Sequence, residues 1–310
     1  LGADLNRASR WMRVPGLGVT FQTSDLAKVV LLVYVARVIA KHEGEEWTFR
    51  DIAFKLLVPI GAICGLILPA NFSTAALLFL SCMLVMFIGR VPLKWIGSIM
   101  GSAALVAVLL LVVAKAYPEL LPRSETWVKR VDTFMGRIPE AETSDANYQV
   151  NNAKIAIASG GLLPNGPGSG TSRNFLPHPY SDMIFAFIVE EYGSIFGGLG
   201  VLLLYVILLF RAVRIANRCE KTFGSLATIG LALSLVVQAL VNMAVAVNLV
   251  PVTGQPLPLV SMGGTSIWFT CLAIGIILSV SRSVYDAQAP PAAKKQRTTP
   301  VEDGAAPAFA

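Results

Sequence analysis

Long apolar runs constrain the fold of this chain more than any other feature of its sequence. Residues 222–249 contain no charged side chain, and residues 96–117 contain only Lys115. A helix needs about 20 mostly apolar residues to cross the hydrocarbon core of a bilayer, so each run is long enough to span it. The whole chain is 55% hydrophobic and 14% charged, whereas a soluble domain has about 25% charged residues. The sequence therefore predicts an all-α polytopic membrane protein.

Seven transmembrane helices are expected from these runs and from the links between them. Their predicted ranges are 24–41, 51–69, 72–89, 96–117, 182–210, 222–249 and 264–282. Pro, Asn and Gly in the links at 69–71 and 89–92 separate runs that would otherwise merge. The segment at 118–181 is longer than a simple connector requires, so we expect one large loop outside the bilayer.

Basic residues indicate which end of each helix faces the cytoplasm. They recur at alternate ends of successive helices, at Arg90, Lys94, Arg211, Arg214, Arg218, Lys221, Arg282, Lys294, Lys295 and Arg297. Because cytoplasmic loops carry an excess of Lys and Arg, residues 1–23, 118–181 and 250–263 are predicted to face outward. The arginines of the N-terminal segment, Arg10 among them, run against this rule, and a substrate role is the alternative explanation for them. Cytoplasmic loops account for much of the net charge of +6, so a nucleic-acid partner need not be invoked.

The predicted organisation has five segments. They are an extracytoplasmic N-terminal segment at 1–23, four transmembrane helices at 24–117, the large extracytoplasmic loop at 118–181, three transmembrane helices with Gly-rich loops at 182–285, and a disordered cytoplasmic tail at 286–310. Because the chain starts in a polar outward segment that an earlier helix would have to place there, we expect it to be incomplete at its N-terminus. The four cysteines show no paired spacing and predict neither a disulfide framework nor a metal site.

The second half of the outward loop is rich in Gly, Ser, Asn and Pro. Five glycines between Gly160 and Gly170 precede Arg173. A Gly-rich backbone lets amides approach an anion closely, and an arginine can hold phosphate oxygens in a bidentate fork. A flexible turn with a solvated arginine explains the same residues, so the pattern alone is only a weak indication of an anion site.

Asp182 stands where this polar loop runs into an apolar helix. One explanation is structural, because an acid in the first turn of a helix is favoured by the helix dipole. The other is chemical: a carboxylate at the outer membrane boundary, near Arg173 and His178, could serve as a general base toward a lipid-linked head group.

Glu190 and Glu191 follow in the same predicted helix. At about 1.5 Å per residue they would lie about 12 to 13 Å inward from Asp182, within apolar depth. Acids at that depth are costly, so they are either functional or paired with a basic residue such as Lys28. The sequence leaves both explanations open.

Three motifs resemble the SEDS family of shape, elongation, division and sporulation proteins, which includes FtsW, RodA and SpoVE. They are RASRWMRVPGLGVTFQTSDLAK near the start, GTSRNFLPHPYSDMIFAFIVEEYG around Asp182, and PVTGQPLPLVSMGGTS before the last helix. The likeness covers residues 1–285, and the chain resembles the last seven of the family's ten membrane helices. Thr23-Ser24-Asp25 departs from the family's Pro-Ser-Glu. The residues of the second and third motifs resemble those of the cell-division member, FtsW, more than those of RodA.

The resemblance implies a peptidoglycan glycosyltransferase that polymerises lipid II during septal wall synthesis, in the bacterial cytoplasmic membrane with its active site facing outward. The implied partners are lipid II, membrane lipid, a class B penicillin-binding transpeptidase and other divisome membrane proteins. Asp182 would act as the base or orient the acceptor hydroxyl, and a divalent cation, Mg²⁺ or Mn²⁺, stays open as a cofactor. The candidate substrate contacts are Arg10, Trp11, Gln22, Ser24, Asp25, Lys28, Arg130, Gln149, Lys154, Arg173, His178, Glu190, Glu191, Ser261, Gly263, Gly264 and Ser266.

Two functions of other classes are compatible with the sequence, besides an elongation role like that of RodA. A lipid II flippase would use intramembrane acids, but it also needs a polar path across the bilayer, and the run GGLGVLLLYVILLF at 197–210 is apolar. A scaffold that only recruits division proteins would tolerate Asn in place of Asp182. The clustering of the polar motifs on the predicted outward side favours the enzyme.

Overall fold

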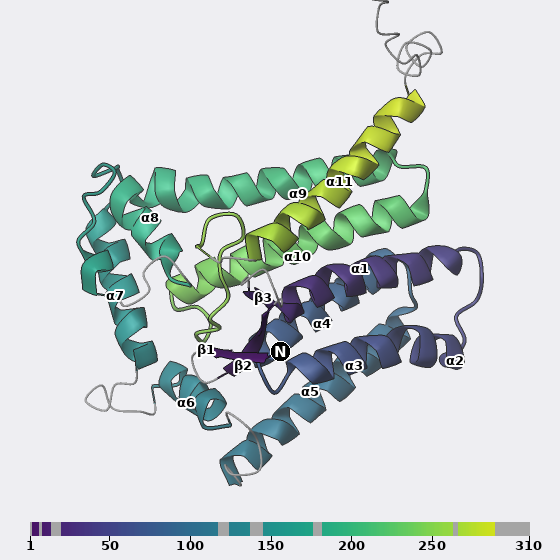
Figure 1. Ribbon diagram of the computed structural model, residues 1–310, viewed down its shortest axis with the longest axis horizontal. Coiled ribbons are helices and arrows are strands. Elements are labelled where there is room, and N and C mark those ends of the chain that lie inside the picture. Colours follow the sequence, from purple (N-terminus) through teal and green to yellow (C-terminus); the bar gives the residue numbers. More distant parts are fainter. Residues whose placement is uncertain are drawn as a thin grey trace, which may run out of the picture.

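The protein is described by a computed structural model that covers residues 2–5, 8–13, 20–116, 124–136, 145–175, 182–262 and 266–288. At positions 2–5, 8–13, 20, 21, 124–127, 129, 145–147 and 173 the backbone alone is described. Helices make up most of the molecule (Figure 1). In chain order they are α1 (Thr23–Lys41), α2 (Phe49–Asp51), the π-helix η1 (Ile52–Leu57), α3 (Val58–Ile67), α4 (Phe72–Ile88), α5 (Leu93–Ala116), α6 (Ser124–Phe134), α7 (Asp145–Gly160), the 3-10 helix η3 (Ser172–Phe175), α8 (Ile184–Tyr192), the π-helix η4 (Gly193–Leu199), α9 (Gly200–Arg218), α10 (Thr222–Ala246) and α11 (Ser266–Gln288).

Each of the seven predicted membrane ranges contains helix. Four helical runs in the described part of the chain are long and apolar enough to cross a bilayer: α5, Ile184–Arg218, α10 and α11. The helical, multi-pass membrane architecture is therefore confirmed, whereas the count of seven spans stays a prediction. The large loop holds α6, α7 and η3, and α11 continues to Gln288, past the predicted start of the tail at 286.

A small antiparallel sheet that the sequence did not predict precedes the first helix. Its strands β1 (Gly2–Leu5), β2 (Ala8–Arg13) and β3 (Thr20–Gln22) pair in the order β1-β2-β3. The register places Trp11 opposite Gln22, and β3 runs directly into α1. The sheet therefore lays the N-terminal segment beside the start of α1.

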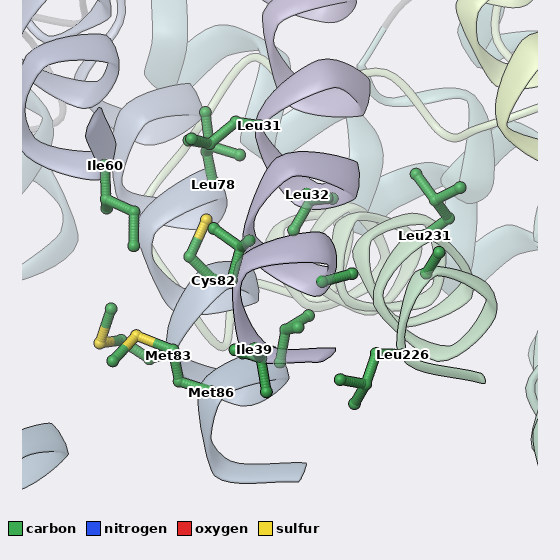
Figure 2. Packing of buried hydrophobic residues seen from close by; sticks show 14 of the residues in the cluster. Leu31, Leu32, Ile39, Ile60, Leu78, Cys82, Met83, Met86, Leu226 and Leu231 are labelled. Carbon is green, nitrogen blue, oxygen red and sulfur yellow. The ribbon is translucent and has the colours of Figure 1, made fainter. Parts of the chain in front are cut away.

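α10 is the central helix of the bundle. It packs against α9, α1, α4 and α11, and it is the most buried of the four long apolar runs. Figure 2 shows Leu31 and Leu32 of α1, Leu78 and Cys82 of α4, and Leu231 of α10 in one buried cluster. Lipid chains are as apolar as leucine, so close packing rather than exclusion of water holds such helices together. This packing fixes the helices whose ends carry the polar groups described below.

The predicted helix at 182–210 differs from the structure, because α8 and α9 do not form one straight helix. Gly193, between them, has φ 73° and ψ 169°, and the next turns are the π-helix η4. A Cβ atom at Gly193 would lie 2.6 Å from the carbonyl carbon and oxygen of Leu163, so the loop before α8 also requires glycine here. The break comes after Glu190 and Glu191, so the depth expected for these two residues stays a prediction.

Candidate functional site

Asp182 lies immediately before α8 and is held in place through its backbone. Its carbonyl oxygen accepts a hydrogen bond of 2.7 Å from Nδ2 of Asn242 on α10. The same amide donates to the carbonyl oxygen of Gln255 at 2.8 Å, and Asn242 is only 1% exposed. One buried side chain thus ties Asp182 to the loop at 250–262.

The carboxylate of Asp182 and the guanidinium of Arg130 face the same point of that loop. A Cβ atom at Gly254 would lie 3.9 Å from Oδ2 of Asp182 and 3.9 Å from Nη2 of Arg130. Arg130 comes from α6, within the large loop. The structure therefore brings a predicted base and a predicted phosphate contact together from distant parts of the chain.

A second polar group links α1 to the same loop. Lys28 forms an ion pair of 2.8 Å with Asp25, one turn earlier on α1, and both side chains are largely buried. Nζ of Lys28 also lies 3.3 Å from Oε1 of Gln238 on α10, and Gln238 in turn donates to the carbonyl oxygen of Pro256 at 2.9 Å. Asp25 therefore pairs with Lys28 although this chain has aspartate where the family has glutamate.

Further hydrogen bonds hold the loop at 250–262 between the helices. Nε2 of Gln255 donates to Oγ1 of Thr74 on α4 at 2.7 Å, and both residues are buried. The hydroxyl of Tyr205 on α9 donates to the carbonyl oxygen of Pro258. Ser261 is buried as well, and its Oγ accepts from the backbone N–H of Leu257 at 2.7 Å. The loop beside Asp182 is therefore a fixed wall of the site.

Cavities lie on both sides of the turn between α3 and α4. One, of about 300 Å³, has mostly apolar walls from α4, α10 and the loop at 250–253, with Arg130 at its edge. The other, of about 280 Å³, is lined by Gln22 and Ser24 at the start of α1, and both cavities reach Asn71. A smaller one, of about 30 Å³, joins Asp25 and Lys28 to Ser266 at the start of α11.

Glu190 anchors the Gly-rich segment instead of facing these cavities. Its Oε1 accepts from the backbone N–H groups of Thr171 and Ser172, at 3.1 and 3.2 Å, and from the hydroxyl of Ser172 at 2.8 Å. Glu190 is 4% exposed. A Cβ atom at Gly170 would lie 2.9 Å from its Oε2, and a Cβ atom at Gly160 would lie 2.8 Å from its Cα, so either would overlap. The alternative pairing with Lys28 is contradicted, because Lys28 contacts Asp25 and Gln238.

Several predicted contacts are not among the groups described above or fall outside the described positions. Gln149 is half-buried and Lys154 is exposed on α7, and neither belongs to the hydrogen-bonded groups described above. Glu191 follows Glu190 on α8, and its carbonyl oxygen accepts from the backbone N–H of Asn165 at 3.0 Å. For Arg10, Trp11 and Arg173 only the backbone is described, and the predictions for His178, Gly263 and Gly264 fall outside the described residues.

Sequence reasoning missed the amides that position the site. Gln238 and Asn242 are four residues apart in an otherwise apolar helix, so they share one face of α10. Polar side chains in a membrane helix are rare enough to have marked that face as functional. Gln255 stood in the third motif but was not selected.

The described side chains include no group of three His, Cys, Asp or Glu residues that could hold a metal ion. Asp182 would offer a divalent cation a single carboxylate, and Mg²⁺ is commonly bound by one or two carboxylates together with substrate phosphates.

Comparisons with known proteins agree with the three motifs. A family model for FtsW, RodA and SpoVE, described as cell cycle protein, matches residues 1–286. Two relatives are named probable peptidoglycan glycosyltransferase FtsW. The one from Geobacter sp. (strain M18) is 32% identical over 283 residues, which cover 91% of this chain and 73% of the relative. The one from Trichlorobacter lovleyi is 32% identical over 284 residues, which cover 91% and 70%.

Two solved structures share the fold. One comes from work on the structural coordination of polymerization and crosslinking by a peptidoglycan synthase complex. It matches with a TM-score of 0.69 and 27% identity, and the match covers 92% of this chain and 76% of the other. The crystal structure of the Thermus thermophilus rod shape determining protein RodA gives a TM-score of 0.61 and 26% identity, with coverage of 92% and 73%. From the match over residues 1–286, this chain belongs to the FtsW, RodA and SpoVE family of cell cycle proteins.

Proposed function

We propose that this chain is a peptidoglycan glycosyltransferase that polymerises lipid II into glycan strands in septal wall synthesis. The names of its relatives support the activity. The observation that carries the assignment is the approach of Asp182 and Arg130 to Gly254, at the edge of an apolar cavity. A base and a cation beside an apolar space suit a substrate whose reacting sugar is joined through pyrophosphate to a lipid.

Asp182 is the proposed general base. The 4-hydroxyl of the acceptor sugar forms a bond to the anomeric carbon of the donor, with inversion, and the bond from that carbon to the pyrophosphate oxygen breaks. The hydroxyl proton passes to the carboxylate of Asp182, and the electron pair leaves with undecaprenyl pyrophosphate. One base is sufficient for this displacement, and a positioned general base contributes roughly 10²–10⁴ in rate.

Arg130 is the proposed contact for the leaving pyrophosphate. Negative charge grows on the pyrophosphate as the bond breaks, and a fixed guanidinium stabilises that charge more in the transition state than in the bound substrate. The cavity of about 300 Å³ beside Arg130 has the apolar walls that the first units of the lipid would need. Asp25 and Lys28 line the smallest cavity. They are proposed to act on the sugars through the loop at 250–262, because Lys28 binds Gln238, which binds the carbonyl oxygen of Pro256.

The proposed setting is the bacterial cytoplasmic membrane, with Asp182 on the outer side and a class B penicillin-binding transpeptidase and divisome proteins as partners. The alternation of basic helix ends supports this orientation. The likeness to a structure from a peptidoglycan synthase complex supports a partner with crosslinking activity.

The test is glycan polymerisation from labelled lipid II by the full-length protein and its transpeptidase partner. Asp182→Asn should lower the rate by about 100-fold or more, since it removes the base and keeps the side-chain shape. Glu46→Gln, which removes an exposed negative charge elsewhere, is the matched control and should keep full activity. Equal polymer from the folded Asp182→Asn protein would remove this residue from the reaction. No polymer from the wild type, together with lipid II movement across vesicle membranes, would identify a transporter.

A further inference from the structure

A groove lies between the C-terminal halves of α9 and α11, away from the loop that carries Gly254. Its volume is about 470 Å³. In Figure 1 this region is the end of α9 farthest from α8. Its apolar lining comes from Leu208, Ile215, Ile274, Ile277, Leu278 and Val284. Because none of the proposed catalytic residues lines it, the groove needs a separate explanation.

Three arginines line one side of this groove. Arg211, Arg214 and Arg218 are spaced three and four residues apart on α9, so they lie on one face of the helix. Their side chains are exposed, and no ion pair or hydrogen bond of these side chains occurs within the described ranges. The acid on α11, Asp286, forms an ion pair with Arg282, with 3.6 Å between Oδ2 of Asp286 and Nε of Arg282. Three like charges therefore gather in a groove whose described lining contains no Asp or Glu.

The combination of apolar walls and an arginine face determines the class of ligand. A free anion such as phosphate would use the arginines and leave the apolar walls without a partner. A neutral lipid would use the walls and leave the charges unmatched. Basic pockets between transmembrane helices on the cytoplasmic side bind the head groups of anionic lipids, and arginine suits phosphate because its fork donates two hydrogen bonds.

We propose that this groove binds an anionic phospholipid of the cytoplasmic leaflet, with its phosphate on Arg211, Arg214 and Arg218 and an acyl chain between α9 and α11. The run Ile184–Arg218, which ends with α9, and α11 are each long and apolar enough to span a bilayer, so the acyl chain would lie in hydrocarbon and the head group at its edge. The leaflet follows from the proposed orientation of the basic helix ends. The lipid would join α9 to α11, which cover α10 from outside, and so would stabilise the bundle at a distance from Asp182.

The experiment measures binding of a fluorescent phosphatidylglycerol to the full-length protein in neutral detergent, with phosphatidylcholine and inorganic phosphate as competitors. Wild type should bind phosphatidylglycerol at least tenfold more tightly than phosphatidylcholine. The triple variant Arg211→Gln, Arg214→Gln, Arg218→Gln should lose about 100-fold in affinity, at about fivefold for each arginine near a membrane surface. Its control, Arg37→Gln, Lys41→Gln, Arg50→Gln, removes three exposed basic charges from α1 and α2 and should bind within twofold of wild type.

Several results would overturn the proposal. Equal binding of both lipids, or unchanged binding by the triple variant, would exclude the groove as an anionic lipid site. Competition by inorganic phosphate as strong as that by the lipid would indicate a free-anion site. Displacement of phosphatidylglycerol by the transpeptidase partner would assign the groove to a protein helix. If the triple variant does not fold, Arg214→Gln alone should still show the fivefold loss. Because polymerisation is not the readout, this outcome is independent of the proposed activity.

Discussion

Replacing Glu190 with alanine should release the Gly-rich segment from α8. One carboxylate oxygen of Glu190 accepts three hydrogen bonds from Thr171 and Ser172, two from backbone N–H groups and one from the hydroxyl of Ser172. It also accepts a longer one, of 3.5 Å, from the hydroxyl of Ser159 on α7. Alanine removes this acceptor from Thr171 and Ser172, whereas the hydroxyl of Ser159 keeps the carbonyl oxygen of Ala156. Because the segment at 160–175 leads into the residues before Asp182, its release should also loosen the approach to the site.

The magnitude follows from the burial of the donors. A buried donor that loses its partner costs about 1–3 kcal/mol. Thr171 is exposed, so water can replace its lost acceptor, whereas both donors of Ser172 are buried. We expect a loss of about 3 kcal/mol once the segment has relaxed. At about 1.4 kcal/mol per factor of ten, the opened segment becomes roughly 100-fold more populated.

Amide hydrogen exchange on the peptide that covers residues 166–175 measures this opening directly. Glu190→Ala should speed exchange at Thr171 and Ser172 by about 100-fold relative to wild type. The exchange rate in Glu190→Gln should lie between those of wild type and Glu190→Ala, because glutamine keeps an acceptor oxygen but loses the added strength of a charged acceptor. Glu46→Ala, at an exposed position, should leave exchange in this peptide unchanged.

Unchanged exchange in a folded Glu190→Ala protein would refute the anchoring role and return Glu190 to the candidate substrate contacts. Faster exchange over the whole chain, rather than in this segment, would also contradict the reasoning. It would mean that Glu190 supports the bundle and not one loop.

Three further predictions concern packing and the polar groups around Asp182. Gly160→Ala should destabilise the protein by about 1–3 kcal/mol, because its Cβ atom would lie 2.2 Å from the carbonyl oxygen of Val189 on α8; Gly61→Ala, with no heavy atom within 4 Å of the added carbon, should not lower the melting temperature. Lys28→Met should cost about 3–5 kcal/mol, because it leaves Asp25 buried and unpaired. The double variant with Asp25→Asn should recover part of that loss in a thermal denaturation assay, and full additivity would contradict the coupling. Asn242→Leu should slow polymerisation, because it releases the carbonyl oxygens of Asp182 and Gln255; Thr228→Val on the same helix removes a buried hydroxyl that has no hydrogen-bond partner in the described structure, and it should keep full activity.

The sequence predicted the helical ranges well because apolar length is a local property. The break at Gly193 could not be predicted in the same way. Glycine is tolerated within membrane helices, and only the fold shows that the backbone of Leu163, thirty residues earlier, leaves no space for a Cβ atom here. The hydrogen bonds of Glu190 to Ser172 depend on the same approach of the loop to α8. The partners of Glu190 therefore could not be predicted from its position along the helix.

The candidate site was predicted in part. Asp182 was singled out by its position between a polar loop and an apolar helix, and Asp25 with Lys28 by their motif. The approach of Arg130 to Asp182 was not predictable, because about fifty residues, α7 and η3 among them, separate α6 from α8. Only the fold shows that both meet at Gly254.

The way Asp182 is held determines what a substitution at this position can report. Asn242 binds the backbone carbonyl oxygen of Asp182, and this hydrogen bond is kept whatever side chain the residue carries. Asn242 is itself buried and shares its amide with the loop at 250–262, so the backbone before α8 stays attached to α10. Exchanging the carboxylate of Asp182 for an amide should therefore leave the position of the residue intact. A loss of polymer in that variant would then report the loss of a base rather than the loss of the site.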